Sequence, residues 1–184
     1  MINIRGGKFL HRKLEQPSLE ITRSTKDICK EGMFNSLGRE IINSSFLDLF
    51  AGSGQIGIEA YSRGAKNVVL NDKNKEPYKI ICNNLDKLGI DDIFVTNYDY
   101  LECLERLKNK GFKFDIIFLD PPYKMILDLE FINKINSYNL LNENGTIVLE
   151  TDYELDKKLF ECSNIKRLKY GRSSIYILRK MKWE

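Results

Sequence analysis

The stretch Leu47-Asp48-Leu49-Phe50-Ala51-Gly52-Ser53-Gly54 runs from a short apolar segment into a helical pattern. Residues 46–50 predict a buried strand and residues 55–62 predict a helix, so the glycine-rich turn lies between them. Gly52 and Gly54 permit a turn that a Cβ would hinder, and they let a ligand approach the backbone closely. Ligands bind beyond the carboxyl ends of the strands in an open α/β sheet, so the turn is a predicted binding element.

Strand and helix patterns alternate after this turn. The predicted strands cover 67–71, 93–96, 114–119 and 145–150, and the predicted helices cover 75–88, 100–108 and 127–138. This alternation, with glycines at helix ends, predicts an α/β fold in which a mostly parallel sheet has helices on both faces. The last third predicts a short helix and then a hairpin, which adds an antiparallel strand and brings the sheet to seven strands; these elements cover 154–160, 165–170 and 174–178.

A basic extension precedes this pattern. Residues 2–14 predict a small hairpin or arm around a Gly pair, and Pro17 separates it from the next segment. Ser24 stands three residues before Asp27, which is the spacing of a capping box, and Gly38 is placed to end the helix. The apolar stripe expected on this helix consists of Ile28, Met33, Phe34 and Leu37. We therefore predict one domain, 1–184, made of an extension (1–40) and a core (41–184).

Composition narrows the class of protein. The 184 residues are 42% hydrophobic and 30% charged, as expected for a soluble globular domain, and no apolar run has the length of a membrane span or a signal peptide. The four cysteines are scattered and there is one His, so the sequence predicts no metal site. Free thiols of this kind are typical of the reducing cytosol, and we expect a cytoplasmic protein.

Charge is distributed unevenly along the chain. Residues 1–30 carry seven Lys or Arg against three acids, and residues 157–184 carry nine against two. The segment between them holds thirteen basic residues and twenty-one acidic ones. Basic ends around an acidic centre favour a polyanionic partner such as a nucleic acid, although terminal Lys and Arg can also serve only solubility.

Carboxylates follow successive predicted strands. Asp48 precedes the glycine turn, Asp72 closes the second strand about twenty residues later, and Asp99 and Asp120 follow the third and fourth strands. The carboxyl ends of parallel strands meet at one edge of a sheet, so we expect these four acids on the same rim. An acid at the position of Asp72 is suited to hold the hydroxyls of a ribose.

The segment Asp120-Pro121-Pro122-Tyr123 predicts a stiff corner at this rim. Each proline fixes φ and removes an N–H donor, and Pro121 keeps Asp120 out of the helical region. One carboxylate, outward carbonyls and one flat ring suit a planar group that bears an amine. The alternative is a proline-rich turn in which Tyr123 only packs. The glycine pattern, completed by Gly57, also occurs in NAD enzymes, but the corner favours another chemistry and no dehydrogenase motif accompanies it.

These motifs together resemble the class I, S-adenosylmethionine-dependent methyltransferases that act on exocyclic amines. More narrowly, the chain is similar to the bacterial family that methylates the N2 amine of a guanine in 16S rRNA (the guanine-966 type). The similarity covers almost the whole chain and is carried by Ile4 to Gly7, Arg12 to Leu14, Arg23 to Asp27, Glu31 to Asn35, Leu47 to Gly54, Gly57 to Ala60, Ser62 to Ala65, Asp120 to Tyr123 and Lys169 to Gly171.

The resemblance implies a Rossmann-like fold and a role for each matched residue. It implies that the target amine is held by Asp120, Pro121, Pro122 and Tyr123, with the ring of Tyr123 stacked on the base. It implies that S-adenosylmethionine is bound by Asp48, Phe50, Ala51, Gly52, Ser53, Gly54, Asp72, Lys73, Asp99 and Tyr100. The basic residues expected to contact RNA are Arg5, Lys8, Arg12, Lys13, Arg23 and Lys26.

The implied partner is 16S rRNA, either free or in an assembling small subunit. The chain departs from the family at Ser24, where Pro is common, and at Ile28 and Lys30, where Arg is usual, so the RNA contacts of this helix stay open. Three alternative functions are a DNA adenine-N6 methyltransferase, a methyltransferase of protein amides or small molecules, and a non-catalytic RNA-binding protein. About sixty residues follow Tyr123, which leaves little room for the added recognition domain usual in DNA enzymes.

Overall fold

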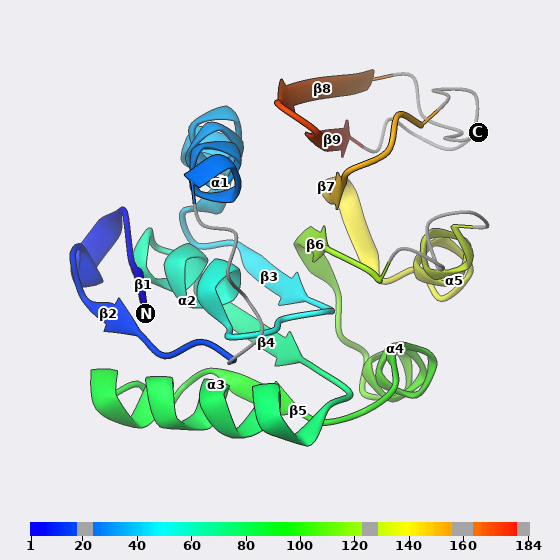
Figure 1. Ribbon diagram of the computed structural model, residues 1–184. Coiled ribbons are helices and arrows are strands. Elements are labelled where there is room, and N and C mark those ends of the chain that lie inside the picture. Colours follow the sequence, from blue (N-terminus) through cyan, green and yellow to red (C-terminus); the bar gives the residue numbers. More distant parts are fainter. Residues whose placement is uncertain (18–23, 123–128, 156–163, 180–184) are drawn as a thin grey trace.

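The computed structural model describes residues 1–17, 24–122, 129–155 and 164–179, without the side chains of 24–27. A seven-stranded sheet forms its centre, in the order β5-β4-β3-β6-β7-β9-β8 (Figure 1). The strands are β3 (Ser45–Asp48), β4 (Asn67–Asn71), β5 (Phe94–Thr96), β6 (Phe114–Leu119), β7 (Leu141–Thr151), β8 (Asn164–Tyr170) and β9 (Ser173–Arg179). β3 to β7 pair in parallel, whereas β9 is antiparallel to both of its neighbours. The predicted mostly parallel sheet with an antiparallel hairpin strand is confirmed.

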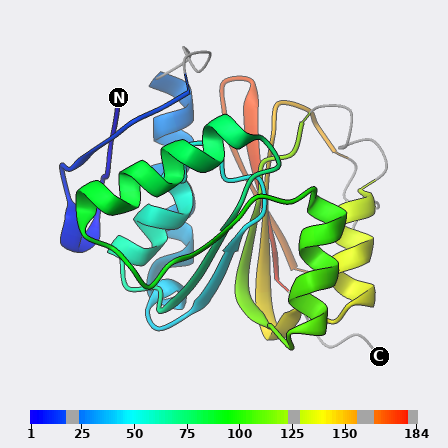
Figure 2. The same cartoon turned by 90° about the horizontal axis from the view of Figure 1, so that it is seen from below.

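Helices cover both faces of the sheet, as predicted (Figure 2). They are α1 (Ser24–Leu37), α2 (Gln55–Ser62), α3 (Lys75–Leu88), α4 (Tyr100–Asn109) and α5 (Glu130–Ser137). Side chains alternate along each strand, so Phe118 joins the core under α1, α2 and α3, and Leu119 joins the core under α4 and α5. This two-sided burial explains why the central strands are almost wholly apolar.

The buried stripe of α1 differs from the predicted one. Ile28 is 57% exposed, whereas Cys29, Met33 and Leu37 are fully or almost fully buried. These three residues follow each other at intervals of four, which places them on one helical face. Ile28 lies one position outside that face. As expected, the helix ends before Gly38, which has a φ of +51° and begins a short 3-10 turn (Gly38–Ile41).

Other boundaries differ from the predicted ones by a few residues. β7 begins at Leu141, four residues before the predicted start, because the irregular register between Phe114 and Ile116 lets it pair with β6 earlier. The helix expected over 127–138 is α5, and 127–128 lie outside the described residues. Most of the helix expected over 154–160 also lies outside them, and residues 154–155 are not helical.

The predicted N-terminal arm is a two-stranded sheet of β1 (Ile2–Asn3) and β2 (Lys13–Leu14), joined through a 3-10 turn (Gly7–Phe9). It packs against α2, where the hydroxyl of Ser62 accepts from the N–H of Phe9 (2.9 Å) and donates to the carbonyl of Gly6 (2.6 Å). Leu14 is fully buried there. The arm is therefore attached to the core by both polar and apolar contacts.

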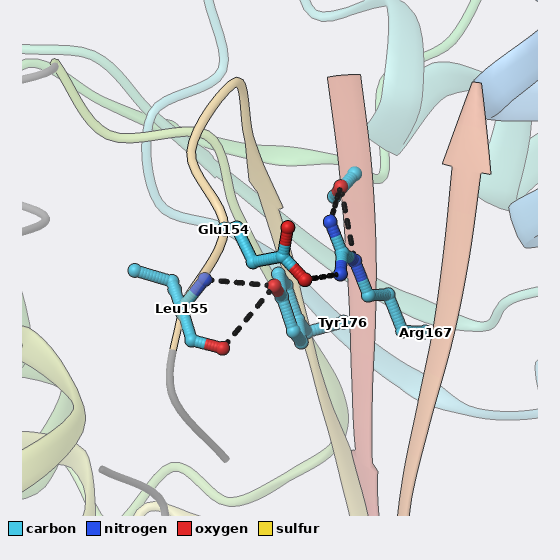
Figure 3. A network of polar contacts seen from close by, with 5 residues as sticks. Glu154, Leu155, Arg167 and Tyr176 are labelled. Atoms are coloured by element: carbon cyan, nitrogen blue, oxygen red, sulfur yellow. Dashed lines mark hydrogen bonds and ion pairs between the residues drawn. The ribbon is translucent and has the colours of Figure 1, made fainter. Parts of the chain in front are cut away.

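The hairpin of β8 and β9 also fixes the segment that comes after β7 (Figure 3). The buried Tyr176 of β9 uses its hydroxyl to accept from the N–H of Leu155 (2.8 Å), and Arg167 of β8 forms an ion pair with Glu154. The guanidinium of Arg167 also donates to the hydroxyl of Ser174 at 3.1 and 3.2 Å. These contacts hold the chain beyond the carboxyl end of β7.

Within the described residues, no helix is both long and apolar enough to cross a bilayer. Cys29, Cys82 and Cys103 are free thiols. Cys162 lies outside the described residues. No group of three or more potential metal ligands occurs in the part of the chain that the structure describes.

Candidate active site

A cleft of about 370 Å³ opens where the strand order reverses. The chain proceeds from β3 outward to β4 and β5 and then returns to β6, which lies on the other side of β3. Ligands of open α/β sheets bind at such a reversal, beyond the carboxyl ends of the strands. The lining residues are Pro17, Leu49, Phe50, Gly52, Asn71, Asp72, Lys73, Asn74, Pro77, Tyr98, Asp99, Tyr100, Asp120, Pro121 and Pro122.

The glycine turn forms one wall of the cleft. Gly52 and Gly54 have φ values of +55° and +77°, which residues other than glycine rarely adopt. Gly57, in the first turn of α2, has a different role, since a Cβ there would lie 2.0 Å from the side chain of Leu70. This glycine lets α2 pack closely on β4, as the third glycine of such turns does.

Asp72 ties the end of β4 to the glycine turn. Its carboxylate accepts from the N–H of Gly52 (3.0 Å) and from the N–H of Asn74 (2.8 Å). The side chain is half-buried and faces the cleft, where a carboxylate can accept from ribose hydroxyls. Lys73 also lines the cleft and is exposed.

Asn71 holds three strand ends together, and its role is not evident in the sequence. Its amide donates to the carbonyls of Leu49 and Tyr98, each at 3.1 Å. Its side-chain oxygen accepts from the hydroxyl of Thr96 (2.8 Å) and from the N–H of Tyr98 (3.2 Å). A buried amide is stable only when it is hydrogen-bonded, and here all of these bonds lead to neighbouring strands or loops. A polar residue at the end of an apolar strand is the only sequence signal of this role.

Asp48 lies behind the glycine turn and does not line the cleft. It is 1% exposed, one oxygen accepts from the N–H of Gly57 (3.2 Å), and Oδ1 has no hydrogen-bond partner among the described residues. The pKa of Asp48 is raised to about 8, mainly because burial penalises the charged carboxylate. The N–H of Gly57 lowers the pKa, and the negative charges of Asp120 and Asp72 contribute to the rise. The protonated, neutral form of Asp48 is therefore favoured near neutral pH in the free protein, and its contact with a cofactor stays a prediction.

Aromatic rings form the far wall of the cleft. Asp99 caps α4 by accepting from the N–H of Leu101 (3.1 Å), which places Tyr100 in the first helical turn. The hydroxyl of Tyr100 donates to the carboxylate of Glu130 (2.9 Å), and its ring lies 6.0 Å from that of Phe50. Both rings face the cleft, and a flat heterocycle can stack against such a wall.

The corner after β6 completes the site. Asp120 is half-buried, Pro121 is buried and Pro122 is exposed, and all three border the same cleft as the glycine turn. β3 and β6 are paired so that Asp48 lies opposite Phe118, two residues before Asp120, and the negative charge of Asp120 contributes to the raised pKa of Asp48. Tyr123 lies outside the described residues, so its stacking role stays a prediction.

The structure thus brings most of the predicted site residues into one place. Those that line the cleft are Phe50, Gly52, Asp72, Lys73, Asp99, Tyr100, Asp120, Pro121 and Pro122. Ala51, Ser53 and Gly54 are buried in the turn behind it. The residues that sequence reasoning missed are Pro17, Leu49, Asn71, Asn74, Pro77 and Tyr98. Apart from Pro17, these are immediate neighbours of predicted residues or lie at the start of α3.

Four of the six residues predicted to contact RNA lie on the arm. Arg5, Lys8, Arg12 and Lys13 are exposed, and the ammonium of Lys8 lies 3.9 Å from the centre of the Tyr61 ring. Arg23 and the side chain of Lys26 lie outside the described residues. Pro17 lies three residues after the end of β2 and lines the cleft, so a short stretch of chain joins the arm to the cleft.

The fold and the site together define a class I methyltransferase. The strand order of the mostly parallel sheet reverses between β3 and β6, and the glycine turn, the acids at the strand ends and the Asp120–Pro122 corner meet there. The family model described as "Conserved hypothetical protein 95" matches residues 2–179, and the chain belongs to that family. The predicted family and fold class are thereby confirmed.

Named relatives agree with this membership. The chain is 36% identical over 180 residues to Ribosomal RNA small subunit methyltransferase D of Haemophilus influenzae, covering 97% of this chain and 92% of the relative. The solved structure of yhhF from Escherichia coli has a TM-score of 0.85 and 29% identity, covering 97% of both chains. The 16S rRNA N2 G1207 methyltransferase of Thermus thermophilus, solved with AdoMet and guanosine, shares the fold at 21% identity and a TM-score of 0.72, over 89% of this chain and 45% of that chain.

Proposed function

We propose that the protein transfers a methyl group from S-adenosylmethionine to the exocyclic N2 amine of a guanine in 16S rRNA. The observation that carries this proposal is that the glycine turn and the Asp120–Pro122 corner border one cleft. The name of the Haemophilus influenzae relative, a ribosomal RNA small subunit methyltransferase, supports the substrate class. A ribosomal substrate would place the protein in the cytoplasm.

The residues around the turn fit S-adenosylmethionine. Asp72 would hold the ribose hydroxyls, and Asp99 with Tyr100 would border the adenine. The buried Oδ1 of Asp48, with no hydrogen-bond partner among the described residues, favours a ligand that brings positive charge to the turn. Ala51, Ser53 and Gly54 would shape the turn, and Phe50 and Lys73 would line the cleft beside the ligand. The cofactor supplies an electrophilic methyl group on a sulfonium.

The corner would hold the target amine. The N2 amine of guanine is a weak nucleophile because its lone pair is delocalised into the ring. The carboxylate of Asp120 and the carbonyl of Pro121 would accept from its two N–H bonds and favour a tetrahedral nitrogen. The methylated nitrogen then loses one proton along the hydrogen bond to Asp120. Positioning and exclusion of water would supply most of the acceleration.

The arm would bind the RNA backbone. Its exposed cations would neutralise phosphates, with Arg23 and Lys26 of the following segment as further candidates. The target base has to leave its stack to reach Asp120, and stacking on Tyr123 would offset about 1–3 kcal/mol of that cost. The partner would be free 16S rRNA or an assembling small subunit.

A labelling experiment tests this function. The protein is incubated with labelled S-adenosylmethionine and separately with in vitro transcribed 16S rRNA, assembled subunits, DNA and protein. We expect label in the RNA or the subunit, recovered as N2-methylguanosine after nuclease digestion. Label in DNA as N6-methyladenine would support a DNA methyltransferase instead. RNA binding with no label in any acceptor would support a non-catalytic RNA-binding protein.

A further inference from the structure

One side chain joins the N-terminal extension to the glycine turn. Asn84 of α3 is 1% exposed, and its amide donates to the carbonyls of Ser53 (3.1 Å) and Glu15 (3.2 Å). Its side-chain oxygen accepts from the N–H of Glu15 (2.8 Å). A buried amide is costly unless it is hydrogen-bonded, so this arrangement strongly restrains the two segments that it contacts.

The two segments belong to different parts of the proposed site. Ser53 is in the glycine turn, and Glu15 begins the strap, which we define as residues 15–17 after β2. Pro17, at the other end of the strap, lines the cleft. Figure 1 shows the chain beyond β2 running beside α3. Asn84 therefore sets the position of the strap, and with it the arm, relative to the turn.

A second contact between α3 and the strap provides a comparison. Lys87, three residues after Asn84, forms an ion pair with the carboxylate of Glu15. The two side chains are 56% and 40% exposed. Ion pairs in such exposed positions contribute little to stability, because water and salt screen them. Of these two contacts, the buried amide should therefore restrain the strap more strongly.

We propose that Asn84 is a positioning residue for methyl transfer, because it holds the RNA-bearing arm in register with the methyl donor at the turn. This inference rests on the proposed function. RNA would still bind the arm, and cofactor would still bind the turn, without Asn84. The distance between the two reacting groups would no longer be fixed, and a displacement of about 1 Å can cost about 100-fold in rate.

The test compares Asn84→Ala with Lys87→Ala. For each variant we measure kcat and KM on 16S rRNA, the Kd for RNA, and the Kd and stoichiometry for S-adenosylhomocysteine by calorimetry. Rates are expressed per cofactor-binding site, so unfolded molecules do not count. We expect Asn84→Ala to lower kcat at least about tenfold with both Kd values within about threefold of wild type. Lys87→Ala should leave all of these values unchanged.

A readout that needs no substrate tests the attachment itself. Hydrogen exchange at the N–H of Glu15 should accelerate at least about tenfold in Asn84→Ala and stay unchanged in Lys87→Ala. Unchanged exchange at Glu15, or a wild-type kcat per site, would overturn the inference. If Asn84→Ala binds no cofactor, Asn84→Asp decides by the same two readouts, since it keeps the acceptor for the Glu15 N–H and loses both donors. A wild-type protein that labels no RNA would instead count against the proposed function.

Discussion

Asp48 and Asp120 follow adjacent strands, but their surroundings give them different chemistry. Asp48 is buried behind the turn and its pKa is raised to about 8, whereas Asp120 is half-buried and borders the cleft. Two carboxylates in such different environments are suited to different roles. The structure thus favours Asp120 as the group that contacts the amine, and Asp48 as a buried group that supports the turn by accepting from the N–H of Gly57.

Asp120→Ala should abolish most of the turnover without loss of cofactor affinity. Removal of the carboxylate leaves one N–H of the amine without an acceptor, so we expect kcat to fall about 100-fold or more. The Kd for S-adenosylhomocysteine should change by less than about threefold, because the ribose and adenine contacts stay intact. Single-turnover rates and calorimetry measure the two quantities. A parallel loss of both would contradict the assigned role.

Asn71→Ala should act on cofactor binding and on stability together. The substitution removes hydrogen bonds to Leu49, Thr96 and Tyr98, and we expect a loss of about 1–3 kcal/mol in the free energy of unfolding. The Kd for S-adenosylhomocysteine should rise about tenfold, since the loops that form the cleft are no longer aligned. Urea denaturation and calorimetry provide the measurements. Asn97→Ala, which loses one bond to the carbonyl of Asp72, is the matched control and should show a smaller effect.

A functional role could be assigned from the sequence where the local motif alone indicates the chemistry of the residue. A carboxylate after a strand, a glycine in a tight turn and a proline corner each have one evident use. Asn71 and Asn84 have none until the strands are paired, because their hydrogen-bond partners lie at least 22 residues away in the chain. Pro17 likewise depends on contacts that are distant in sequence, since Glu15 of the same strap is bound by Asn84.

The arm is the element on which RNA affinity should depend. Replacing Lys8 and Arg12 together by Glu should weaken RNA binding and lower its dependence on salt, because fewer counterions are released. Each lost phosphate contact should reduce the slope of log Kd against log salt by about 0.7–0.9. Titration of RNA at several salt concentrations gives this slope.

Lys110 and Lys113 offer a control for this prediction. Both are exposed and lie between α4 and β6, near the amino end of β6, whereas the cleft lies at the carboxyl ends of the strands. Their replacement by Glu changes the net charge of the protein equally, so it separates local contacts from overall charge. An equal loss of affinity in the two double variants would argue against the arm as the RNA-binding element.

The boundaries of helices and strands were predicted correctly where the local sequence pattern agrees with the tertiary environment. α2, α3, β4 and β6 begin and end at the predicted residues, because their apolar periods and bounding residues are clear. Three members of the predicted stripe of α1 are buried, Met33, Phe34 and Leu37, but Cys29 rather than Ile28 faces the core. The order of β8 and β9 depends on long-range pairing, and the predicted hairpin did not show which strand would adjoin β7.

At the scale of the whole molecule, the raised pKa of the buried Asp48 carboxyl should make stability depend on pH. Its pKa is about 8 in the folded protein and about 3.8 when exposed, so the folded state holds a proton that the unfolded state releases. Stability from this group should therefore fall as pH rises from about 4 to about 8, and level off above that. Thermal denaturation of wild type and Asp48→Asn across this range isolates the effect. We expect the variant to gain in Tm relative to wild type as pH rises, and a constant difference would contradict the prediction.

The place of β9 between β7 and β8 has a consequence for synthesis. Ile175 and Ile177 of β9 are completely buried, yet they are among the last described residues of the chain. A nascent chain that ends before Ser173 leaves the side of β7 unpaired, with its backbone groups open to other strands. The nascent protein therefore has an exposed strand edge that can pair with other chains until translation has passed Arg179. Chaperones that act at the ribosome should reduce aggregation most strongly during that interval.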